Sequence, residues 1–308
     1  MSQLAVITPY ASLQLRFESG SDAKKNFVLN FPRRSEQMPE PAVAVKHHPS
    51  SVNDLMVRQL FDQSRRKNII HAMCASFSSI DAALARRLVA ELGPDFDDDM
   101  DVTDLGTSQI HQITQLLRAA KFTLPDGTCL SPAGEYNLRL GILKEFDPDI
   151  VVTCAQKVAI FEGHPFIVEA AVSLGGKRMK EGISVFRFAN RIPLLFEGGG
   201  DVVTRTANKR INWNSYKISP KQDKIGVFVS IVSTKIPFKG TGKEYVGDDI
   251  VEMQVAVKQA LQNCGNQLKQ KLLRRNADKE RQERKRNLTK VRPGNIQREA
   301  YRLYVCVC

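Results

Sequence analysis

The sequence predicts an α+β protein in which a block of helices precedes a mixed α/β unit that ends in a long helix. Two patterns indicate this order: helical periodicity with helix caps over residues 51–146, then period-two and continuous apolar runs from residue 148. A third observation is an apolar stripe at spacings of three and four over residues 250–272. The chain has 308 residues and is 42% hydrophobic, which suggests about two domains.

The N-terminal residues 4–31 predict two β runs, LAVITPYASLQLRFE and NFVLNF, joined by the polar turn SGSDAKK. Prolines then space out a polar connector that ends in KHHPSS. We expect this connector to lead into a separate helical unit.

Helix signals follow the connector. Ser51 is predicted to cap a first helix, and Ser78 with Asp81 forms a capping-box pattern before IDAALARRLVAEL, which Gly93 ends. The run IHQITQLLRAAKF predicts another helix. A further helix is expected to open at Ser131 and to continue through GEYNLRLGILKEF.

Strand patterns begin after residue 148. The runs AIFEGHPFIVEAAVSL, GISVFRFANRIPLLF and KIGVFVSIVSTKIPF predict strands of one sheet. A long amphipathic helix is expected to start at Asp248-Asp249, with acids near its N-terminus and bases near its C-terminus, as the helix dipole favours. Its predicted apolar stripe consists of Ile250, Met253, Val257, Leu261, Cys264, Leu268 and Leu272.

The composition is that of a globular protein. No apolar run approaches the ~20 residues of a membrane span, and the N-terminus lacks a signal-peptide pattern, so we expect an intracellular protein with no membrane partner. The six cysteines are scattered and fit free thiols. His47, His48 and His164 lack partners at ligand spacing, so no metal site is expected.

Most of the net charge of +12 lies near the C-terminus. Residues 269–302 hold thirteen Lys or Arg against four acids, a balance of 13 − 4 = +9. The run KERQERKRNLTKVRP is compatible with contact to nucleic acid, with a nuclear-import signal, or with a solvated tail.

A glycine-broken turn, VSTKIPFKGTGKEYVGDDI, crowds Lys235, Lys239 and Lys243 between a β run and the start of the long helix. Phosphate is the natural ligand for such a turn, because glycine permits close backbone approach and an ammonium is a compact charge. It is not a Walker loop, since Pro237 and Glu244 stand where that pattern needs Gly and Ser or Thr. Any phosphate pocket must therefore be completed elsewhere.

Several longer segments of the sequence resemble a known protein family. LAVITPYA, KHHPSS, CLSPAGEYNLRLGI, EGHPFIVEAAVSLGG, FRFANRIPLLFE, DVVTRT, INWNSYKI and VSTKIPFKGTGKEY occur in order and resemble the B subunit of type IIB DNA topoisomerases (topoisomerase VI) over roughly residues 3–290. The resemblance implies that 1–46 is the end of an ATPase domain with its linker. It further implies a helix-two-turns-helix domain over 47–147, an α/β transducer domain resembling ribosomal protein S5 domain 2 over 148–275, and a basic, disordered tail over 276–308.

The resemblance also implies what is missing. The family's ATP site, with its Glu and Asn helix, its D-x-G-x-G turn and its glycine-rich lid, lies upstream of LAVITPYA, and none of these is in the sequence. We therefore expect an N-terminally truncated B subunit. ATP and Mg²⁺ are implied as cofactors of the full-length family protein, and this chain alone is expected to bind neither and to contain no complete catalytic site.

Residue roles follow from the same resemblance. Lys243 is expected to reach the γ-phosphate of ATP in the neighbouring domain, and Lys239 is a weaker candidate. Lys235 is expected to point to solvent or to pair with an acid. Basic residues of the helical domain and the tail are candidates for contact with double-stranded DNA: Arg65, Arg66, Lys67, Arg86, Arg87, Arg284, Lys285 and Arg286.

Two functions remain open. In the first, the chain is a B subunit, or a fragment of one, that transduces ATP binding and hydrolysis to strand passage by a DNA-cleaving A subunit. That A subunit is expected to dock on residues 248–275, with a second B subunit joining on ATP binding to give a heterotetramer in the nucleus. In the second, it is an ATP-independent DNA-binding or scaffold protein derived from that subunit.

Overall fold

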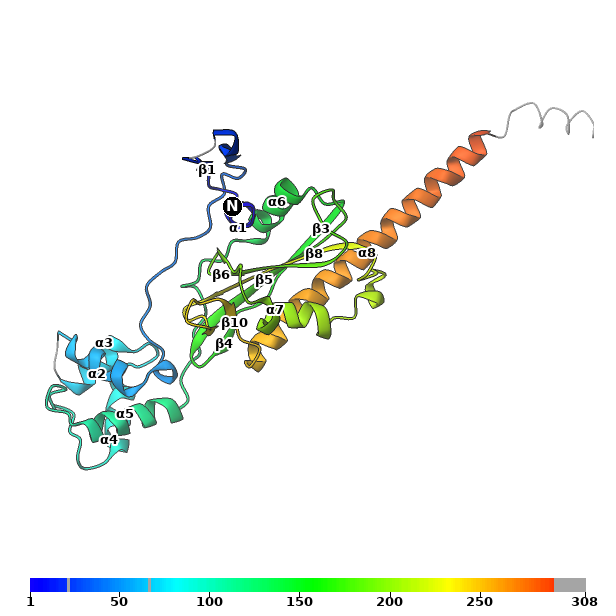
Figure 1. Ribbon diagram of the computed structural model, residues 1–308. Coiled ribbons are helices and arrows are strands. Elements are labelled where there is room, and N and C mark those ends of the chain that lie inside the picture. The colour runs from blue at the N-terminus through cyan, green and yellow to red at the C-terminus, as the bar shows by residue number, and fades with distance from the viewer. Residues whose placement is uncertain (21–22, 66–67, 291–308) are drawn as a thin grey trace, which may run out of the picture.

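The computed structural model describes residues 1–20, 23–65 and 68–290. A helical unit lies at one end, a β-sheet flanked by helices occupies the middle, and one long helix leaves the sheet at the other end (Figure 1). The helical unit and the sheet have separate hydrophobic cores. The helical block, the sheet and the long helix thus follow one another in the predicted order.

The N-terminal segment differs from the prediction in its first part. Residues Ser2–Ile7 form helix α1 rather than a strand, whereas β1 (Leu13–Phe17) and β2 (Phe27–Phe31) pair as an antiparallel hairpin. Helix α1 packs on α6 (Glu135–Phe146) at Gly141, where a Cβ would collide with the Val6 carbonyl. The apolar run LAVI is therefore buried as a helix, because Val6 and Ile7 enter the core beneath the sheet.

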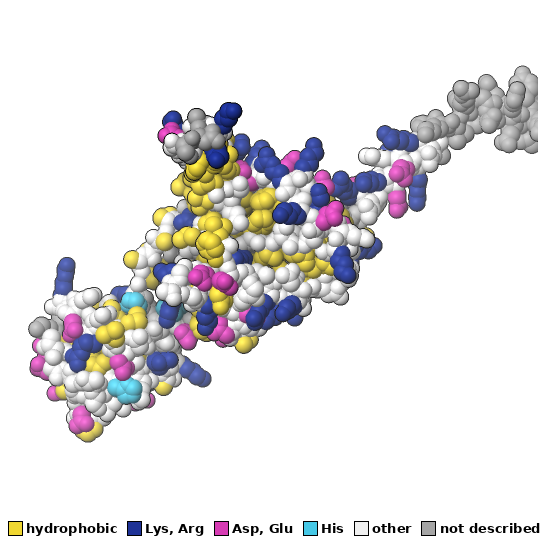
Figure 2. Space-filling model, in the orientation of Figure 1, with side chains coloured by type: hydrophobic (Ala, Val, Ile, Leu, Met, Phe, Trp, Pro, Cys, Tyr) yellow, Lys and Arg dark blue, Asp and Glu magenta, His cyan; other side chains and the backbone are white. Residues whose placement is uncertain are grey.

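One face of the β1–β2 hairpin is apolar. The cross-strand pairs on this face are Leu13 with Phe31, Leu15 with Leu29, and Phe17 with Phe27. The side chains of the pairs Leu15 with Leu29 and Phe17 with Phe27 are exposed. Figure 2 shows hydrophobic side chains gathered along this projecting segment. The hairpin contributes to none of the hydrophobic clusters of the described residues.

The helical unit contains η2 (Pro49–Ser51), α2 (Asp54–Asp62), α3 (Ile69–Ser76), α4 (Ala82–Leu92) and α5 (Thr107–Ala119). Asn53, not Ser51, caps α2, because the Met56 N–H donates to Asn53 Oδ1 at 2.9 Å. Asp81, not Ser78 as the capping-box pattern implied, caps α4 by accepting the Leu84 N–H at 2.8 Å, and Gly93 ends the helix with φ of 102° as predicted. Helix α3 was not predicted; its N-cap is Asn68, which accepts from Ile70 N–H.

The sheet is built from β3 (Ile150–Ala155), β4 (Ala159–Phe161), β5 (His164–Leu174), β6 (Gly182–Ala189), β7 (Ile192–Pro193) and β8 (Lys224–Ser233). Its order is β3-β5-β8-β6-β7, and β4 pairs with β5. Only β6 and β8 run parallel among these pairs. The three predicted runs form strands, and β3 is an additional edge strand that the sequence patterns missed.

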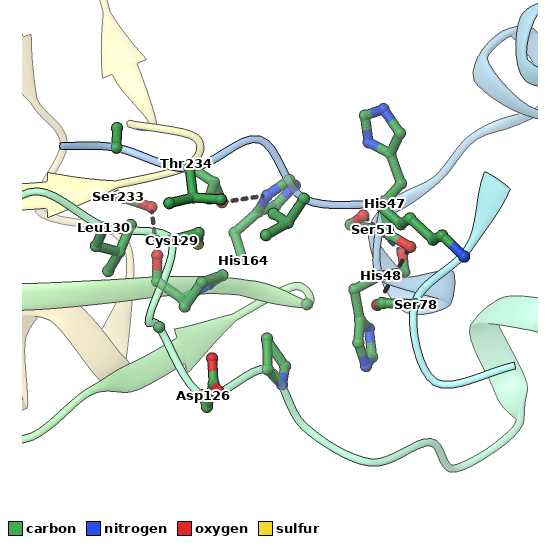
Figure 3. A pocket seen from close by; sticks show the side chains of 18 of the residues that line it. His47, His48, Ser51, Ser78, Asp126, Cys129, Leu130, His164, Ser233 and Thr234 are labelled. Atoms are coloured by element: carbon green, nitrogen blue, oxygen red, sulfur yellow. Dashed lines mark hydrogen bonds between the residues drawn. The ribbon is translucent and has the colours of Figure 1, made fainter. Parts of the chain in front are cut away.

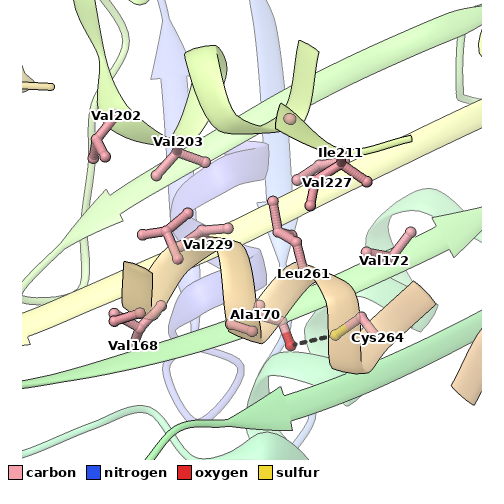
Figure 4. Close-up of a cluster of buried hydrophobic side chains, with 14 of the residues drawn as sticks. Val168, Ala170, Val172, Val202, Val203, Ile211, Val227, Val229, Leu261 and Cys264 are labelled. Carbon is pink, nitrogen blue, oxygen red and sulfur yellow. Dashed lines mark hydrogen bonds between the residues drawn. The ribbon is translucent and has the colours of Figure 1, made fainter. Parts of the chain in front are cut away.

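Both faces of the sheet are covered. Ala170 and Val172 of β5 face the core shared with α8 (Val251–Lys290), while Ala171 between them faces α6 and α1. Helix α7 (Val202–Arg205), the π-helical turn η4 (Thr206–Arg210) and η5 (Trp213–Tyr216) pack beside α8, as Figures 1 and 4 show. These two buried faces explain why the central strands are almost continuously apolar.

Glu169 connects the sheet to the start of α6. Its carboxylate, buried in β5, accepts the backbone N–H groups of Ala133 and Gly134 at 3.0 and 2.6 Å. Helix α6 therefore begins at Glu135, after the Ser131 at which it was expected to open. Ser131 itself donates to the Glu40 carbonyl and so fastens the connector to this loop.

Helix α8 confirms the predicted stripe and corrects the expected boundary of the tail. The stripe residues from Ile250 to Leu268 are buried, and Leu272 packs at the edge of the same core. The helix continues past residue 275 to Lys290, so residues 276–290 are helical rather than disordered. The rest of the expected tail, residues 291–308, lies outside the described residues.

Candidate functional site

The lysine turn folds into a short hairpin between the sheet and the long helix. Strands β9 (Phe238–Lys239) and β10 (Tyr245–Val246) pair, and the Glu244 N–H donates to the Lys239 carbonyl at 3.3 Å. Gly240 and Lys243 have φ of 81° and 54°, so the tip uses the left-handed region twice. Glycine adopts this conformation without strain, whereas at Lys243 the surrounding turn must hold it.

The three lysines have different environments. Lys239 Nζ lies 2.8 Å from Asp249 Oδ2, and this hydrogen bond raises the pKa of the ammonium. Lys243 is exposed at the tip, and within the described residues no side chain pairs with its ammonium. Lys235 is also exposed and lies just after β8, rather than within the strand as expected. Because Lys235 lies before the β9–β10 hairpin and Lys239 is paired, Lys243 is the hairpin lysine that remains available to a ligand.

A buried carboxylate, Asp201, holds the base of the hairpin. Its Oδ2 accepts the Val246 backbone N–H at 3.2 Å, and its Oδ1 accepts the Val203 and Thr204 N–H groups that begin α7. Burial raises the pKa of Asp201, and the guanidinium of Arg187 at 3.4 Å opposes that effect. One side chain thus joins a helix start, a strand of the sheet and the lysine hairpin.

Arg187 extends this network along the sheet edge. It lies buried in β6 and donates to the carbonyls of Leu194 at 3.1 Å and Phe196 at 2.8 Å. The loop after β7 is therefore fixed from beneath, although the side chains of Leu195 and Phe196 are 62% and 70% exposed. The buried pair Arg187 and Asp201 fastens both this loop and the lysine hairpin.

A second carboxylate, Asp248, fixes the segment that leads from the hairpin into α8. Arg210 binds both of its oxygens at 2.6 and 2.8 Å, and Arg205 approaches Oδ2 at 3.2 Å. Burial disfavours the charged carboxylate, but the hydrogen bonds from Arg210 and Arg205 outweigh it and lower the pKa of Asp248. The π-helical turn supplies Arg210, and such turns are frequent at functional sites.

The residues predicted to contact DNA lie on two separate surfaces. Arg65 follows α2, and Arg86 and Arg87 are exposed on α4, where Arg86 lies 3.9 Å from Asp98. Arg66 and Lys67 lie outside the described residues. Arg284, Lys285 and Arg286 are exposed on the far part of α8, at the opposite end of the molecule (Figures 1 and 2). The structure does not bring the two groups together.

The sequence patterns did not identify the anchoring network. Its members come from separate elements: Arg187, Asp201, Arg210 and Asp248. One signal was present, because Arg187 is a charged residue inside an apolar strand and a buried charge requires a partner. The identity of that partner depends on the tertiary fold.

Metal-binding clusters and membrane spans are both absent from residues 1–20, 23–65 and 68–290. No group of three or more His, Cys, Asp or Glu side chains in these ranges is arranged to hold a metal ion. No helix in the same ranges combines the length and apolar character needed to cross a bilayer.

Comparison with known proteins places most of the chain in one family. Residues 125–284 match the family described as "Topoisomerase VI B subunit, transducer". The B subunit of DNA topoisomerase 6 from Arabidopsis thaliana is 57% identical over 293 residues, which cover 95% of this chain and 44% of that protein. The Oryza sativa subsp. indica protein of the same name is 55% identical, with 95% and 42% covered.

A relative with lower sequence identity extends the comparison. The B subunit of type 2 DNA topoisomerase 6 from Saccharolobus islandicus (strain L.S.2.15 / Lassen #1) is 30% identical over 278 residues, which cover 89% of this chain and 51% of that protein. The chain therefore spans about half the length, or less, of these curated relatives.

Proposed function

The chain belongs to the topoisomerase VI B-subunit family, and from this premise we propose that it couples nucleotide state to strand passage in a type IIB DNA topoisomerase. The observation that carries the proposal is the lysine hairpin. Lys243 has no partner among the described residues at the tip, while Asp201 holds the base and Asp248 holds the start of α8. A force on the tip would reach the helix through α7 and η4, because Asp201 links the hairpin to the start of α7, while Arg205 and Arg210 of α7 and η4 hold Asp248.

Lys243 is proposed to bind the terminal phosphate of ATP held by an ATPase domain of the full-length protein. The residues present would supply one group to that ligand. This group is the Lys243 ammonium, on a turn that contains Gly240 and Gly242. ATP supplies a γ-phosphate that is present before hydrolysis and absent after it. Because Lys243 gains a charge-assisted hydrogen bond only in the first state, the two positions of the hairpin differ in free energy.

Lys239 has a smaller role in this proposal. Its ammonium is already held by Asp249, so contact with phosphate requires that this pair open. Asp248 therefore fixes the start of α8, and the neighbouring Asp249 restrains Lys239.

Contact with an A subunit is proposed on α8, but not through its apolar stripe. Met253, Val257 and Leu261 are buried against the sheet and are not available to a partner. The contact is therefore assigned to the exposed face of residues 248–275 and to the continuation of the helix after Leu272. We also propose that the full-length protein forms a heterotetramer in which a second B subunit joins when ATP binds. The nucleus is the proposed location.

DNA binding is the second candidate function, and it would also suit an ATP-independent scaffold. Two observations favour it: the far part of α8 is a solvent-exposed basic helix, and Arg86 and Arg87 are exposed in the helical unit. We propose that unit as a helix-two-turns-helix domain. Phosphate contacts of this kind position a protein on duplex DNA without selecting a sequence.

The two functions are separated by one experiment. The full-length protein that contains this span is combined with an A subunit, and decatenation is measured with and without ATP. ATP-dependent decatenation that falls with Lys243→Ala supports the coupling role. DNA binding with no ATP-dependent activity, unchanged by Lys243→Ala, supports the scaffold role instead.

A further inference from the structure

A cavity of about 790 Å³ lies between the helical unit and the sheet. His47, His48, Ser51 and Ser78 line it on one side, and His164 and Thr234 line it on the other (Figure 3). Two connecting segments, residues 42–46 and 123–131, complete the wall. Its volume lies within the roughly 300–1,000 Å³ that small-molecule sites occupy, and interfaces between structural units are a preferred location for them.

The cavity is lined by apolar side chains that remain uncovered. Val43, Val45 and Leu124 line it and are 59%, 55% and 65% exposed. They come from the two connecting segments. An apolar molecule placed there would remove this surface from water, which is favourable in proportion to the area covered.

Basic residues outnumber acidic ones in the polar part of the lining. Five lining residues are cationic or can become so: Lys46, His47, His48, His164 and Arg191. The acidic lining residue is Asp126, and its Oδ1 is already engaged by the Thr128 N–H at 3.0 Å and hydroxyl at 2.8 Å. Burial lowers the pKa values of His48 and His164 and so disfavours their charged forms, but Lys46 and Arg191 against Asp126 still leave an excess of positive charge that favours an anion.

Two of these basic side chains already make hydrogen bonds within the protein. His48 Nε2 lies 3.2 Å from the Thr123 carbonyl, and its Nδ1 accepts the Ser50 N–H, so both ring nitrogens are used. Lys46 Nζ donates to the Cys74 carbonyl at 2.8 Å. These two side chains hold the wall in place rather than offering donors to a ligand.

His164 and Arg191 are different. His164 Nδ1 lies 3.0 Å from Thr234 Oγ1, which leaves Nε2 without a hydrogen bond among the described residues. Burial lowers the pKa of His164, and the positive charge of Lys235 lowers it further. Arg191 uses one guanidinium nitrogen on the Tyr10 hydroxyl at 3.0 Å, and its other N–H groups make no hydrogen bond in the described chain.

We propose that this cavity binds an aromatic carboxylic or sulfonic acid, with its rings against Val43, Val45 and Leu124 and its acidic group at His164 and Arg191. The site is distinct from the lysine hairpin and does not depend on the function proposed for it. A ligand there touches the helical unit and the sheet at once, so its binding stabilises their relative orientation.

The test uses the chain of residues 1–308 and two probes of nearly equal shape, the anion 8-anilinonaphthalene-1-sulfonate and the neutral N-phenyl-1-naphthylamine. Fluorescence titration should give one saturable site for the anion, with binding at least tenfold tighter than for the neutral probe. His164→Gln should weaken binding of the anionic probe roughly tenfold, because one charge-assisted hydrogen bond is lost. Binding of the neutral probe should not change. Equal affinity for the two probes overturns the proposal.

Variants that fill the cavity test whether the probe binds there. Leu124→Trp and Val45→Trp each place a large ring in the cavity, and either should abolish binding, because both side chains are exposed and their replacement removes little packing. Leu55→Trp, on the exposed face of α2, is the matched control and should bind as the original chain does. Leu29→Lys removes apolar surface from the β1–β2 hairpin; if it abolishes binding while Leu124→Trp does not, the probe lies on the hairpin and the proposal fails.

Discussion

Asp201 accepts the backbone N–H of Val246 at 3.2 Å and thereby joins the start of α7 to the base of the lysine hairpin. The same carboxylate lies 3.4 Å from the buried guanidinium of Arg187. Removing a carboxylate from such a pair leaves an uncompensated buried charge, which is more costly than the pair itself is stabilising.

Asp201→Ala should therefore lower the free energy of unfolding by about 3–5 kcal/mol, because Arg187 loses its charge partner and three N–H groups lose their acceptor. Urea unfolding followed by circular dichroism measures the change. Asp249→Ala is the control, since its side chain is 57% exposed and its pair with Lys239 contributes little. Similar losses for both variants would contradict the anchoring role of Asp201.

Lys243→Ala, made in the full-length protein, should leave the fold intact within about 0.5 kcal/mol, because the side chain is exposed. ATP turnover should fall roughly ten- to a hundredfold, the effect of losing about 1.5–3 kcal/mol from one charge-assisted hydrogen bond. Lys235→Ala is the matched control and should change turnover much less. If the control variant is the inactive one, the assignment of the phosphate-binding lysine is wrong.

Gly141→Ala should separate α1 from α6. The added Cβ meets the Val6 carbonyl, and overpacking of this kind typically costs about 1–3 kcal/mol. We expect faster proteolysis of the N-terminal segment, measured by mass spectrometry of limited digests. Gly199→Ala is the control, because no atom lies within 4 Å of the Cβ position there. Unchanged digestion of the Gly141 variant would show that α1 adjusts without loss.

The pair formed by Asp248 and Arg210 should make stability depend on pH at the acidic end. Arg210 and Arg205 lower the pKa of Asp248 below its ordinary value of 3.8, so the unfolded chain takes up a proton first as pH falls. The stabilising contribution is present above pH 3.8 and is lost as pH falls through the folded pKa. Arg210→Gln should be less stable at pH 7, and its deficit should shrink below about pH 3.8. A deficit that stays constant over this range in urea titrations would contradict the coupling.

Duplex DNA binding should be steeply salt-dependent if α8 contacts phosphates. Replacing Arg284, Lys285 and Arg286 by Gln should reduce the slope of log K against log salt by roughly 0.9 for each phosphate that is no longer neutralised. Fluorescence anisotropy at several salt concentrations measures the slope. Arg86→Gln with Arg87→Gln tests the helical unit in the same way. A slope altered by the second variant alone would place the DNA interface there.

The parts of the fold that could be predicted are those with a local signal. The stripe from Met253 to Leu268 has helical spacing, and the runs of β5 and β8 are almost continuously apolar because both faces of the sheet are covered. Helix α1 could not be recognised from LAVI, since a short apolar run fits a strand or a buried helix equally well and packing at Gly141 decides.

The candidate site was predicted only at its tip. Lys243, Gly242 and Gly240 lie within four residues of one another in the sequence, so the turn was visible there. The acceptor for Val246 N–H lies in a different segment, at Asp201, and nothing local to either residue indicates that they meet. The pairing of Lys239 with Asp249, which separates the two candidate lysines, likewise depends on how the hairpin returns to α8.

Helix α8 runs for 40 residues without interruption, from Val251 to Lys290. At 1.5 Å per residue it is a rod of about 60 Å, fixed at its start where Asp248 binds Arg205 and Arg210 and packed against the sheet as far as Leu272. A rod of this length amplifies angle into distance: a tilt of about 5° at the anchored end displaces the far end by about 5 Å. A rotation of the sheet and α8 by a few degrees, as the proposed coupling would require, would therefore move the basic end of the helix by about the length of a side chain.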